Sequence, residues 1–280
     1  MAEVKPFQLV IDEHIEQQLP ADHPCAVLLG GVEGSRVNAC GRVGDADVML
    51  RFNDEEQRLE IHFLKKFAEL GSQPAPLFLN FTHLDITTSF GRSFKQPLAK
   101  AVGLKKGMEK PRVLDATAGL GEDAFLMAAL GCTVYCVERH PLVHLLLTEV
   151  LHRTSGYMDP YPEIVERMSL SGGDAVSEMQ RMIDAGSDDY DAVYLDPMYP
   201  EKKRHKSART RKPIWFLRNL LAGETADDEQ ILFEAALELA CKRVVVKRPN
   251  HAPVLQAEGY AKPAVSHKAK NFRFDVYPRK

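Results

Sequence analysis

Cysteine is scarce in this sequence of 280 residues, which contains only five. The number is odd and no two cysteines are spaced as C-x-x-C, so a disulfide scaffold is not indicated, and we expect reduced thiols. Cys132 and Cys136 could suggest a metal pair. Small residues at the start of a buried strand are the simpler interpretation, and we predict that the protein holds no metal.

Long apolar runs are also missing. No stretch approaches the ~18–20 apolar residues that cross a bilayer, and the first residues show no basic-then-apolar signal pattern. We therefore expect a cytoplasmic protein that does not span a membrane. No internal repeat occurs either. Apolar residues make up 45% and charged residues 27% of the chain, which is typical of a soluble globular protein.

A strong net charge is absent, because 36 basic and 39 acidic side chains leave only −3. That figure alone argues against a nucleic-acid partner, but the charge is unevenly distributed. From Glu201 to Arg218, eight Lys or Arg residues accompany one acid, and from Cys241 to Lys280 ten accompany two. The late part of the chain is therefore basic.

The first ninety residues show strand-like alternation. Apolar residues alternate with polar ones over Val48–Phe52 and again over Leu59–Phe63, around a polar turn, and this pattern predicts a β-hairpin. Phe78–Phe81 is predicted as another short strand, and Gly30 and Gly31 are predicted to break regular structure. We expect a small β-rich N-terminal domain over residues 1–90.

From residue 91 onward we expect a second domain, 91–280, which begins with a Gly- and Lys-rich linker over Gly91–Lys110. Strands then alternate with helices, and this order predicts an α/β fold with a parallel sheet and right-handed crossovers. Phe272–Tyr277 alternates strictly, as a half-exposed antiparallel edge strand does. The other strands are expected at 112–117, 133–137, 168–170, 192–195 and 244–247, and the helices at 122–130, 141–152 and 227–240.

A glycine turn, Asp115–Gly121 (DATAGLG), follows the first of these strands. Glycines let a backbone approach a ligand closely, although a plain tight turn is the alternative. Glu138 ends the next strand, 19 positions after Gly119, which is the spacing of a carboxylate that binds two ribose hydroxyls. Gly119-x-Gly121-x-x-Ala124 therefore also fits a dinucleotide fingerprint. Alone, this pattern does not separate NAD from S-adenosylmethionine.

The acids Glu122 and Asp123 lie in the first turn of the following helix. Two carboxylates there repel a pyrophosphate and suit a cationic ligand, although routine capping by acidic residues is the alternative. S-adenosylmethionine carries a sulfonium and an ammonium and no phosphate. The two acids therefore favour it over NAD.

A second motif, Asp196-Pro197-Met198-Tyr199, follows a buried strand. It places a carboxylate, a proline carbonyl and an aromatic ring at the carboxyl edge of the sheet, where open α/β folds bind ligands. Asp196 and the Pro197 carbonyl can accept the hydrogens of an exocyclic amine, and Tyr199 can stack on its base. A plain strand-to-loop turn is the alternative.

Together these motifs resemble those of class I S-adenosylmethionine-dependent methyltransferases. The Asp-Pro-Met-Tyr block is similar to the Asp/Asn-Pro-Pro-Tyr/Phe signature of amino-group methyltransferases, from which Met198 departs. More closely, the blocks DATAGLGEDAF, VERHP, VYLDPMYP and KRVVVKRP resemble, in this order, the small-subunit rRNA methyltransferase J family. The resemblance runs from about Phe90 to Tyr277, and the first ninety residues share it only loosely.

The resemblance implies a Rossmann-like class I methyltransferase sheet with an antiparallel last strand. It also implies an enzyme that methylates the 2-amino group of one guanosine near the 3′ end of 16S rRNA. The cofactor is then S-adenosylmethionine, with S-adenosylhomocysteine as product and no metal. The partner is 16S rRNA or the small ribosomal subunit, and no obligate protein partner is evident.

Individual residues receive roles from the same resemblance. Glu138 would take the ribose hydroxyls, Arg139 would lie beside the adenine, and Asp174 with the Ala175 N–H would face the adenine edge. The catalytic group comprises Asp196, Pro197 and Tyr199. The cofactor-binding group comprises Asp115, Gly119, Gly121, Glu122, Asp123, Glu138, Arg139, Asp174, Ala175 and Asp196.

Basic residues that follow the Asp-Pro-Met-Tyr block are predicted to bind RNA phosphates, although a solvated loop is the alternative. Lys247 and Arg248 end another strand and are expected to open on the same edge of the sheet. The RNA-binding group comprises Lys203, Arg204, Lys206, Arg209, Lys247 and Arg248. Alternatives for the whole protein are another RNA or DNA amino-group methyltransferase, a methyltransferase for proteins or small molecules, an RNA-binding module without activity, and an NAD-dependent oxidoreductase.

Neutralising Lys203, Arg204, Lys206 and Arg209 together tests the role of the basic run. Each lost phosphate contact should reduce the slope of log affinity against log salt by about one unit. Filter binding of small-subunit RNA over a salt series measures this slope, and affinity for the cofactor should hardly change. An unaltered slope would mean that the run is only a solvated loop.

Overall fold

The computed structural model describes residues 8–20, 22–33, 38–39, 46–65, 74–187, 190–197, 226–239 and 241–279. It divides into two compact units. Within the described residues, the first unit contains the chain up to Asn80 together with His140–Gly156, and the second contains Phe81–Arg139, Tyr157 to residue 197, and residue 226 onward. The predicted domain boundary near residue 90 stays a prediction.

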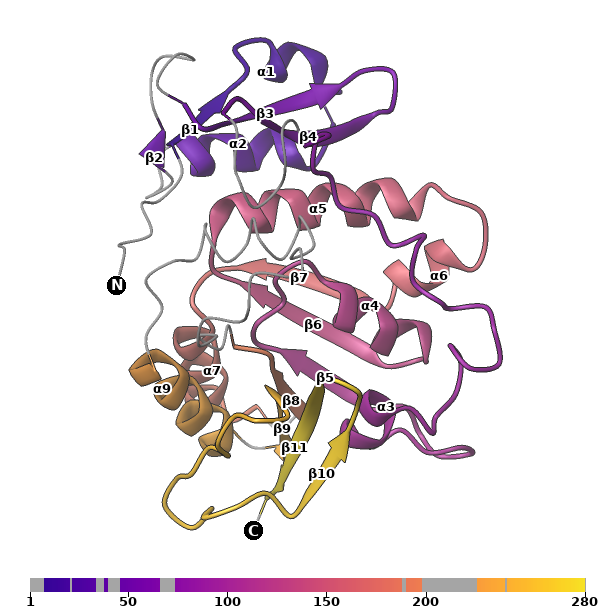
Figure 1. Ribbon diagram of the computed structural model, residues 1–280, viewed down its shortest axis with the longest axis vertical. Coiled ribbons are helices and arrows are strands. Elements are labelled where there is room, and N and C mark those ends of the chain that lie inside the picture. The colour runs from indigo at the N-terminus through magenta and orange to yellow at the C-terminus, as the bar shows by residue number, and fades with distance from the viewer. Residues whose placement is uncertain are drawn as a thin grey trace. The chain divides into compact units, whose positions relative to one another are not determined.

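The first unit is built on a small sheet in the order β2-β1-β3-β4 (Figure 1). Its central hairpin confirms the sequence prediction, since β3 and β4 pair antiparallel with Leu50 opposite Ile61. The alternating apolar side chains of both strands are buried. The strands are β1 (Gln8–Ile11), β2 (Asn38–Ala39), β3 (Val48–Asn53) and β4 (Arg58–Phe63), and the helices are α1 (Ile15–Gln18), α2 (Cys25–Glu33) and α5 (Pro141–Ser155).

Two expectations for this unit were wrong. Helix α2 runs through Gly30 and Gly31, which were predicted to break regular structure. Its Cys25 is buried and its thiol lies 3.6 Å from the Leu145 carbonyl of α5, so packing against α5 outweighs the low helix propensity of glycine. Phe78–Phe81 forms no strand, and only Leu77 makes an isolated bridge, to Ile61.

The second unit contains a sheet in the order β10-β11-β9-β8-β5-β6-β7 among the described residues. Strands β5 to β9 are mutually parallel and β11 is antiparallel to β9, which confirms the predicted Rossmann-like sheet. The order reverses between β5 and β8. The strands are β5 (Arg112–Asp115), β6 (Thr133–Glu138), β7 (Met168–Gly172), β8 (Tyr190–Leu195), β9 (Cys241–Pro249), β10 (Val265–Lys268) and β11 (Phe272–Pro278).

The prediction that Phe272–Tyr277 lies half-exposed at the edge was wrong. β10 pairs with the outer side of β11 and is itself the edge strand. The polar residues of β11 are buried because they satisfy each other: the Nε of Arg273 donates to Asp275 at 2.9 Å. A guanidinium nitrogen of Arg273 also donates to the Ala252 carbonyl at 2.9 Å. Strict alternation therefore marks an internal ion pair here, not a solvated face.

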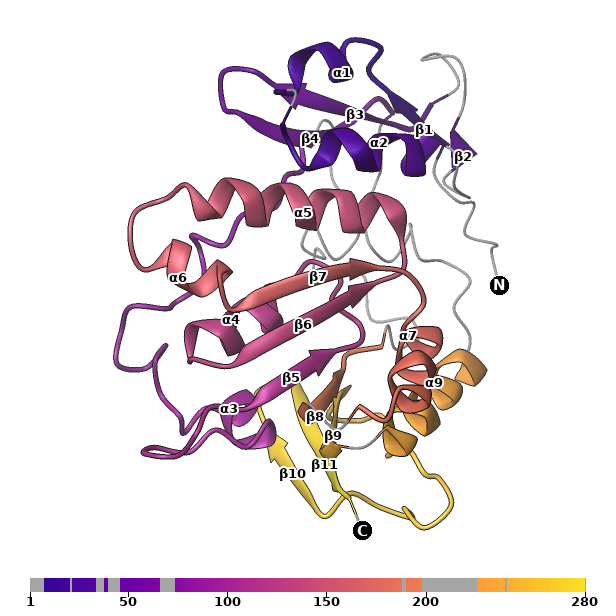
Figure 2. The same cartoon turned by 180° about the vertical axis from the view of Figure 1, so that it is seen from behind.

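Helices cover both faces of this sheet. A right-handed crossover from β5 to β6 and one from β8 to β9 run in opposite directions along the sheet, so α4 and α9 lie on opposite faces. Figure 2 shows α7 and α9 together on one side. Helix α3 lies inside the segment that was expected to be a linker. The helices are α3 (Pro97–Ala101), α4 (Glu122–Ala129), α6 (Tyr161–Val165), α7 (Ala175–Asp184) and α9 (Ala226–Glu238).

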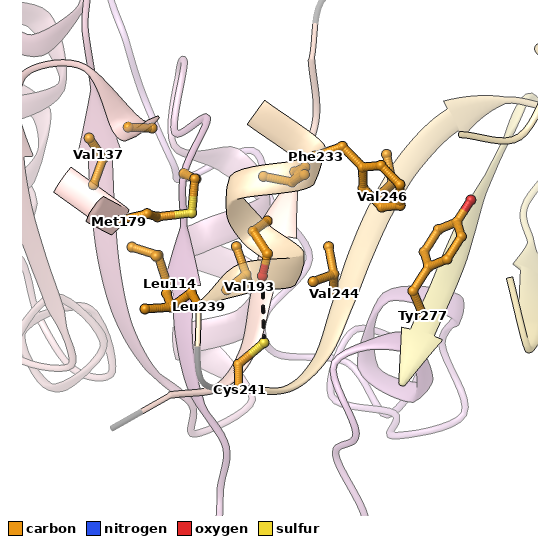
Figure 3. Packing of buried hydrophobic residues seen from close by; sticks show 14 of the residues in the cluster. Leu114, Val137, Met179, Val193, Phe233, Leu239, Cys241, Val244, Val246 and Tyr277 are labelled. Atoms are coloured by element: carbon orange, nitrogen blue, oxygen red, sulfur yellow. Dashed lines mark hydrogen bonds between the residues drawn. The ribbon is translucent and has the colours of Figure 1, made fainter. Parts of the chain in front are cut away.

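An apolar cluster lies between the sheet and the pair α7 and α9 (Figure 3). Phe233 of α9 is fully buried there and meets the ring of Tyr277 edge-on, with ring centroids 4.8 Å apart. None of the described helices is both long and apolar enough to cross a membrane.

Replacing Phe233 by alanine should lower the free energy of unfolding by about 3–5 kcal/mol, because a large aromatic side chain leaves a cavity in a close-packed core. Ile231 of the same helix is 53% exposed, so Ile231→Ala should change the free energy of unfolding by no more than about 0.5 kcal/mol. Urea denaturation measures both variants. Equal losses in the two would contradict the packing described here.

Candidate active site at the carboxyl edge of the sheet

The carboxyl ends of β5 and β8 meet where the strand order reverses, which is where open α/β sheets bind ligands. Two hydrogen bonds join the segment that leaves β5 to the end of β8 and the residue after it. The Ala116 N–H donates to the Tyr194 carbonyl at 3.1 Å, and the Asp196 N–H donates to the Thr117 hydroxyl at 2.6 Å. Asp196 is therefore held beside the glycine turn by its own backbone.

The glycine turn adopts the conformation that its composition predicts. Gly119 has φ +53° and Gly121, the N-cap of α4, has φ +76°, a region that side chains disfavour. A Cβ on Gly119 would meet nothing closer than the Thr117 carbonyl at 3.8 Å. The space beside this backbone is open, as a cradle for a ligand requires.

Glu138 closes the other side of the turn. It ends β6, its side chain is buried, and its Oε2 accepts a hydrogen bond from the Gly119 N–H at 2.9 Å. Its backbone carbonyl accepts from the Gly173 N–H at 3.0 Å, which ties β6 to the segment after β7. The sequence spacing between Gly119 and Glu138 thus corresponds to direct contact.

Asp115 ends β5 and is only 1% exposed. The pKa of this carboxyl is raised to about 8, chiefly by burial and to a smaller extent by Asp123 and Asp196, while the Thr117 N–H bond and Lys247 act to lower it. Asp115 is therefore mostly protonated at neutral pH. It can then donate a hydrogen bond as well as accept one.

Lys247 of β9 joins two acidic residues of the site. Its ammonium lies 2.6 Å from Asp123 Oδ2 and 2.9 Å from Asp196 Oδ2. The Tyr194 hydroxyl donates to the same Asp123 oxygen at 2.5 Å. These contacts join Asp123, Tyr194, Asp196 and Lys247 in one network. Asp115 at the end of β5 interacts electrostatically with three of them, and the five residues are called the carboxylate–lysine cluster.

Burial and charge act in opposite directions in this cluster. Burial lowers the pKa of Lys247, but Asp196 and Asp123 outweigh it and raise that pKa above its usual value. Lost hydration raises the pKa of Asp196, Lys247 opposes this, and Asp123 adds to it. With Asp115 protonated, one ammonium faces two carboxylates. The cluster is net negative and suits a cationic ligand.

The remaining predicted cofactor residues lie around this centre. Glu122 of α4 forms an ion pair with His83, Nε2 to Oε1, at 3.3 Å. Arg139 follows β6 and is exposed. Asp174 is the N-cap of α7, where its carboxylate accepts from the Ser177 N–H at 2.9 Å, and the next residue, Ala175, is buried.

Arg248 differs from its predicted role as an RNA contact. Its side chain is 2% exposed and forms an ion pair with Glu229 of α9, because neighbouring residues of a strand point to opposite faces. The structure therefore offers no surface for that contact. Pro197 is described and half-buried. Tyr199, Lys203, Arg204, Lys206 and Arg209 lie outside the described residues.

Sequence analysis does not single out Thr117, Tyr194 or His83. Tyr194 had a signal, since it stands two positions before Asp196 and so shares its face of β8. The sequence also held a clue to the role of Lys247 inside the site, because this lysine interrupts a buried apolar run. Among the described residues, no three His, Cys, Asp or Glu side chains are grouped so as to hold a metal ion. The absence of a metal in the whole protein stays a prediction.

Comparisons with known proteins agree with this arrangement. A family model of SAM-dependent methyltransferases matches residues 44–279. Ribosomal RNA small subunit methyltransferase J of Photobacterium profundum is 46% identical over 67% of this chain and 71% of its own length. The protein of the same name from Dechloromonas aromatica is 40% identical over 85% of this chain and 90% of its own.

A solved structure extends the likeness over nearly the whole chain. The crystal structure of a SAM-dependent methyltransferase from Neisseria gonorrhoeae has a TM-score of 0.62 and 26% identity, and covers 97% of this chain and 96% of that one. The relatives indicate the same kind of protein as the strand order and the contact between the glycine turn and Glu138. The chain belongs to the small-subunit ribosomal RNA methyltransferase J family of SAM-dependent methyltransferases.

Proposed function

We propose that this protein transfers a methyl group from S-adenosylmethionine to the exocyclic 2-amino group of a guanosine near the 3′ end of 16S rRNA. The observation that carries the proposal is the meeting of Asp196 and the Gly119 turn at the point where strand order reverses. A cofactor cradle and an acceptor for an amine then share one crevice. The names of the relatives support small-subunit rRNA as the substrate.

The residues at the crevice fit this cofactor. The net negative cluster around Asp123 and Asp196 suits a ligand with an ammonium and a sulfonium. Acidic side chains at the start of α4 disfavour the pyrophosphate of NAD. The carboxylate of Glu138 has several acceptor sites, so it can keep the Gly119 N–H and still accept from ribose hydroxyls.

Asp196 and the Pro197 carbonyl are the proposed acceptors for the target amine. A guanine amine is a poor nucleophile because its lone pair is delocalised into the ring. Two hydrogen bonds from its protons would localise that pair on nitrogen. Bound S-adenosylmethionine would supply an electrophilic methyl on a sulfonium: the C–N bond would form as the C–S bond breaks, and the electron pair of the C–S bond would stay on sulfur. The alkylated nitrogen would then release its proton to water, for which no strong base is needed.

Chain segments outside the described residues complete the proposal. Tyr199 would stack on the guanine, and Lys203, Arg204, Lys206 and Arg209 would contact phosphates. A base in a helix cannot reach a sheet edge, so the target is a single-stranded or flipped nucleotide. A ribosomal substrate places the enzyme in the cytoplasm.

Mass mapping of small-subunit rRNA tests the function directly. Cells without the protein should lack one methyl group on a guanosine near the 3′ end, and the wild-type gene should restore it. Purified protein should transfer labelled methyl to that same RNA. Identical mass maps of the rRNA from the two strains, together with no methyl transfer in vitro, would refute the proposal.

Glu138→Ala should weaken binding of S-adenosylmethionine by ~1.5–3 kcal/mol, the scale of hydrogen bonds to a charged group. Glu163 of α6, whose carboxylate is 63% exposed, provides the control, and Glu163→Ala should bind as the wild type does. Calorimetry measures both, with melting curves to verify folding. Wild-type affinity in Glu138→Ala would remove Glu138 from the site.

Asp196→Ala should lower the rate of methyl transfer by ~10²-fold or more, the range observed when a preorganised partner of the transition state is deleted. Asp196→Asn keeps one acceptor oxygen and should retain part of the activity. Asp191→Ala, at the opposite end of the same strand, is the control. Single-turnover transfer of labelled methyl measures all three, and a folded Asp196→Ala enzyme at near wild-type rate would contradict the assignment.

A further inference from the structure

Strands β8 and β9 carry an aspartate–lysine pair at each end. At their amino ends Lys242 lies 2.5 Å from Asp191, and at their carboxyl ends Lys247 lies 2.9 Å from Asp196. The two pairs are five residues apart on both strands, because the strands run parallel in matched register. Their surroundings differ, since the side chain of Lys242 is 75% exposed and that of Lys247 only 21%.

Lys247 faces acidic and aromatic groups from every strand and helix that reaches it. Asp196 of the segment after β8 and Asp123 of α4 contact its ammonium, and Tyr194 of β8 bonds to Asp123. The ring of Phe272 of β11 lies 5.1 Å away, and Asp115 at the end of β5 is the third carboxyl nearby. Among the described residues of the cluster, Lys247 is the one cation.

These contacts leave Lys247 poorly suited to hold an RNA phosphate. A phosphate would have to replace two carboxylates that already bind the ammonium at short distance in a half-enclosed place. Its charge acts inside the site, on the residues that surround it. The position of Lys247 at a strand end led to the prediction of an RNA contact, because sequence position alone does not show which charges are already paired.

We propose that Lys247 is a positioning residue for methyl transfer: it holds the Asp196 carboxylate ionised and directs one of its oxygens toward the target amine. This inference rests on the proposed function, in which Asp196 accepts a proton of that amine. Lys247 binds Oδ2 of Asp196, and among the described residues Oδ1 has no hydrogen-bond partner, so Oδ1 is the oxygen left for the amine.

The physical reason is competition among neighbouring carboxyl groups. Without the ammonium, the carboxylate of Asp196 would lie beside that of Asp123 with no cation, and like charges raise the pKa of one of the two. A protonated carboxyl carries an O–H donor on one oxygen and is a weaker acceptor than a carboxylate on the other. The N–H of the guanine amine that faces Asp196 would then meet a weaker acceptor, and the lone pair would stay more delocalised. Lys247 also joins Asp196 to α4, which fixes the carboxylate relative to the glycine turn.

Lys247→Met tests this, with Lys242→Met as the matched control and Lys247→Arg as the charge-conserving variant. Single-turnover methyl transfer should fall by at least ~10-fold in Lys247→Met at neutral pH. The acid limb of its pH–rate profile should move up by ~1–3 pH units, the scale of one lost opposite charge. Lys247→Arg should restore the position of that limb, and Lys242→Met should alter neither quantity.

A phosphate contact would behave differently. It would leave the acid limb in place and reduce the salt slope of RNA binding by about one unit, and this result in Lys247→Met would overturn the proposal. Affinity for S-adenosylmethionine and melting curves are measured for each variant. If Lys247→Met does not fold, Lys247→Gln, which keeps a polar end, is tested in its place.

A second measurement separates this inference from the proposed function. Carboxyl ¹³C NMR of the protein without RNA follows the titration of Asp196, which Asp196→Asn identifies by the loss of its signal. The pKa of Asp196 should be higher in Lys247→Met than in wild type. An unchanged titration would overturn the role of Lys247 even in an active enzyme. If the wild-type protein is inactive on rRNA but the titration of Asp196 shifts in Lys247→Met, the proposed substrate is refuted and the pairing of Lys247 with Asp196 is not.

Discussion

Strands β5 and β8 are neighbours in the sheet, yet the chain leaves them toward opposite faces. β5 continues into α4 on one face and α9 lies on the other, so none of the helices in the described part of the chain covers the point between the ends of the two strands. The Asp196 N–H and the Thr117 hydroxyl close this gap with a hydrogen bond of 2.6 Å. At this junction the bond sets the position of Asp196 relative to the glycine turn.

Charge within the junction is arranged so that burial and pairing offset each other. Asp115 is the most enclosed of the three acids and holds its proton near neutral pH, since its pKa lies at about 8. Asp123 and Asp196 share the ammonium of Lys247. A site with one more carboxylate than cations attracts a cationic ligand without leaving several buried charges unpaired.

The two ends of β8 and β9 show how environment separates residues of the same type. At one end Lys242, whose side chain is 75% exposed, pairs with Asp191, and water reaches the ammonium and screens the interaction. Asp196 and Lys247 form the same pair at the other end, where a helix, a tyrosine and an aromatic ring surround it. The spacing of the two pairs in the sequence is identical, and only the structure shows that Lys242 lies in solvent and Lys247 in the crevice.

The sequence by itself determined the elements and much of the site. The hairpin, the alternating strands and helices, and the contact between the Gly119 turn and Glu138 follow from local patterns, since backbone conformation and strand ends depend on neighbouring residues. Tertiary structure decided what those patterns leave open. α2 continues through two glycines because α5 packs on it, and the polar residues of β11 are buried because Arg273 and Asp275 pair. Lys247 turns inward because two carboxylates from other segments reach it. Such long-range pairings depend on residues far apart in the chain, and no local pattern encodes them.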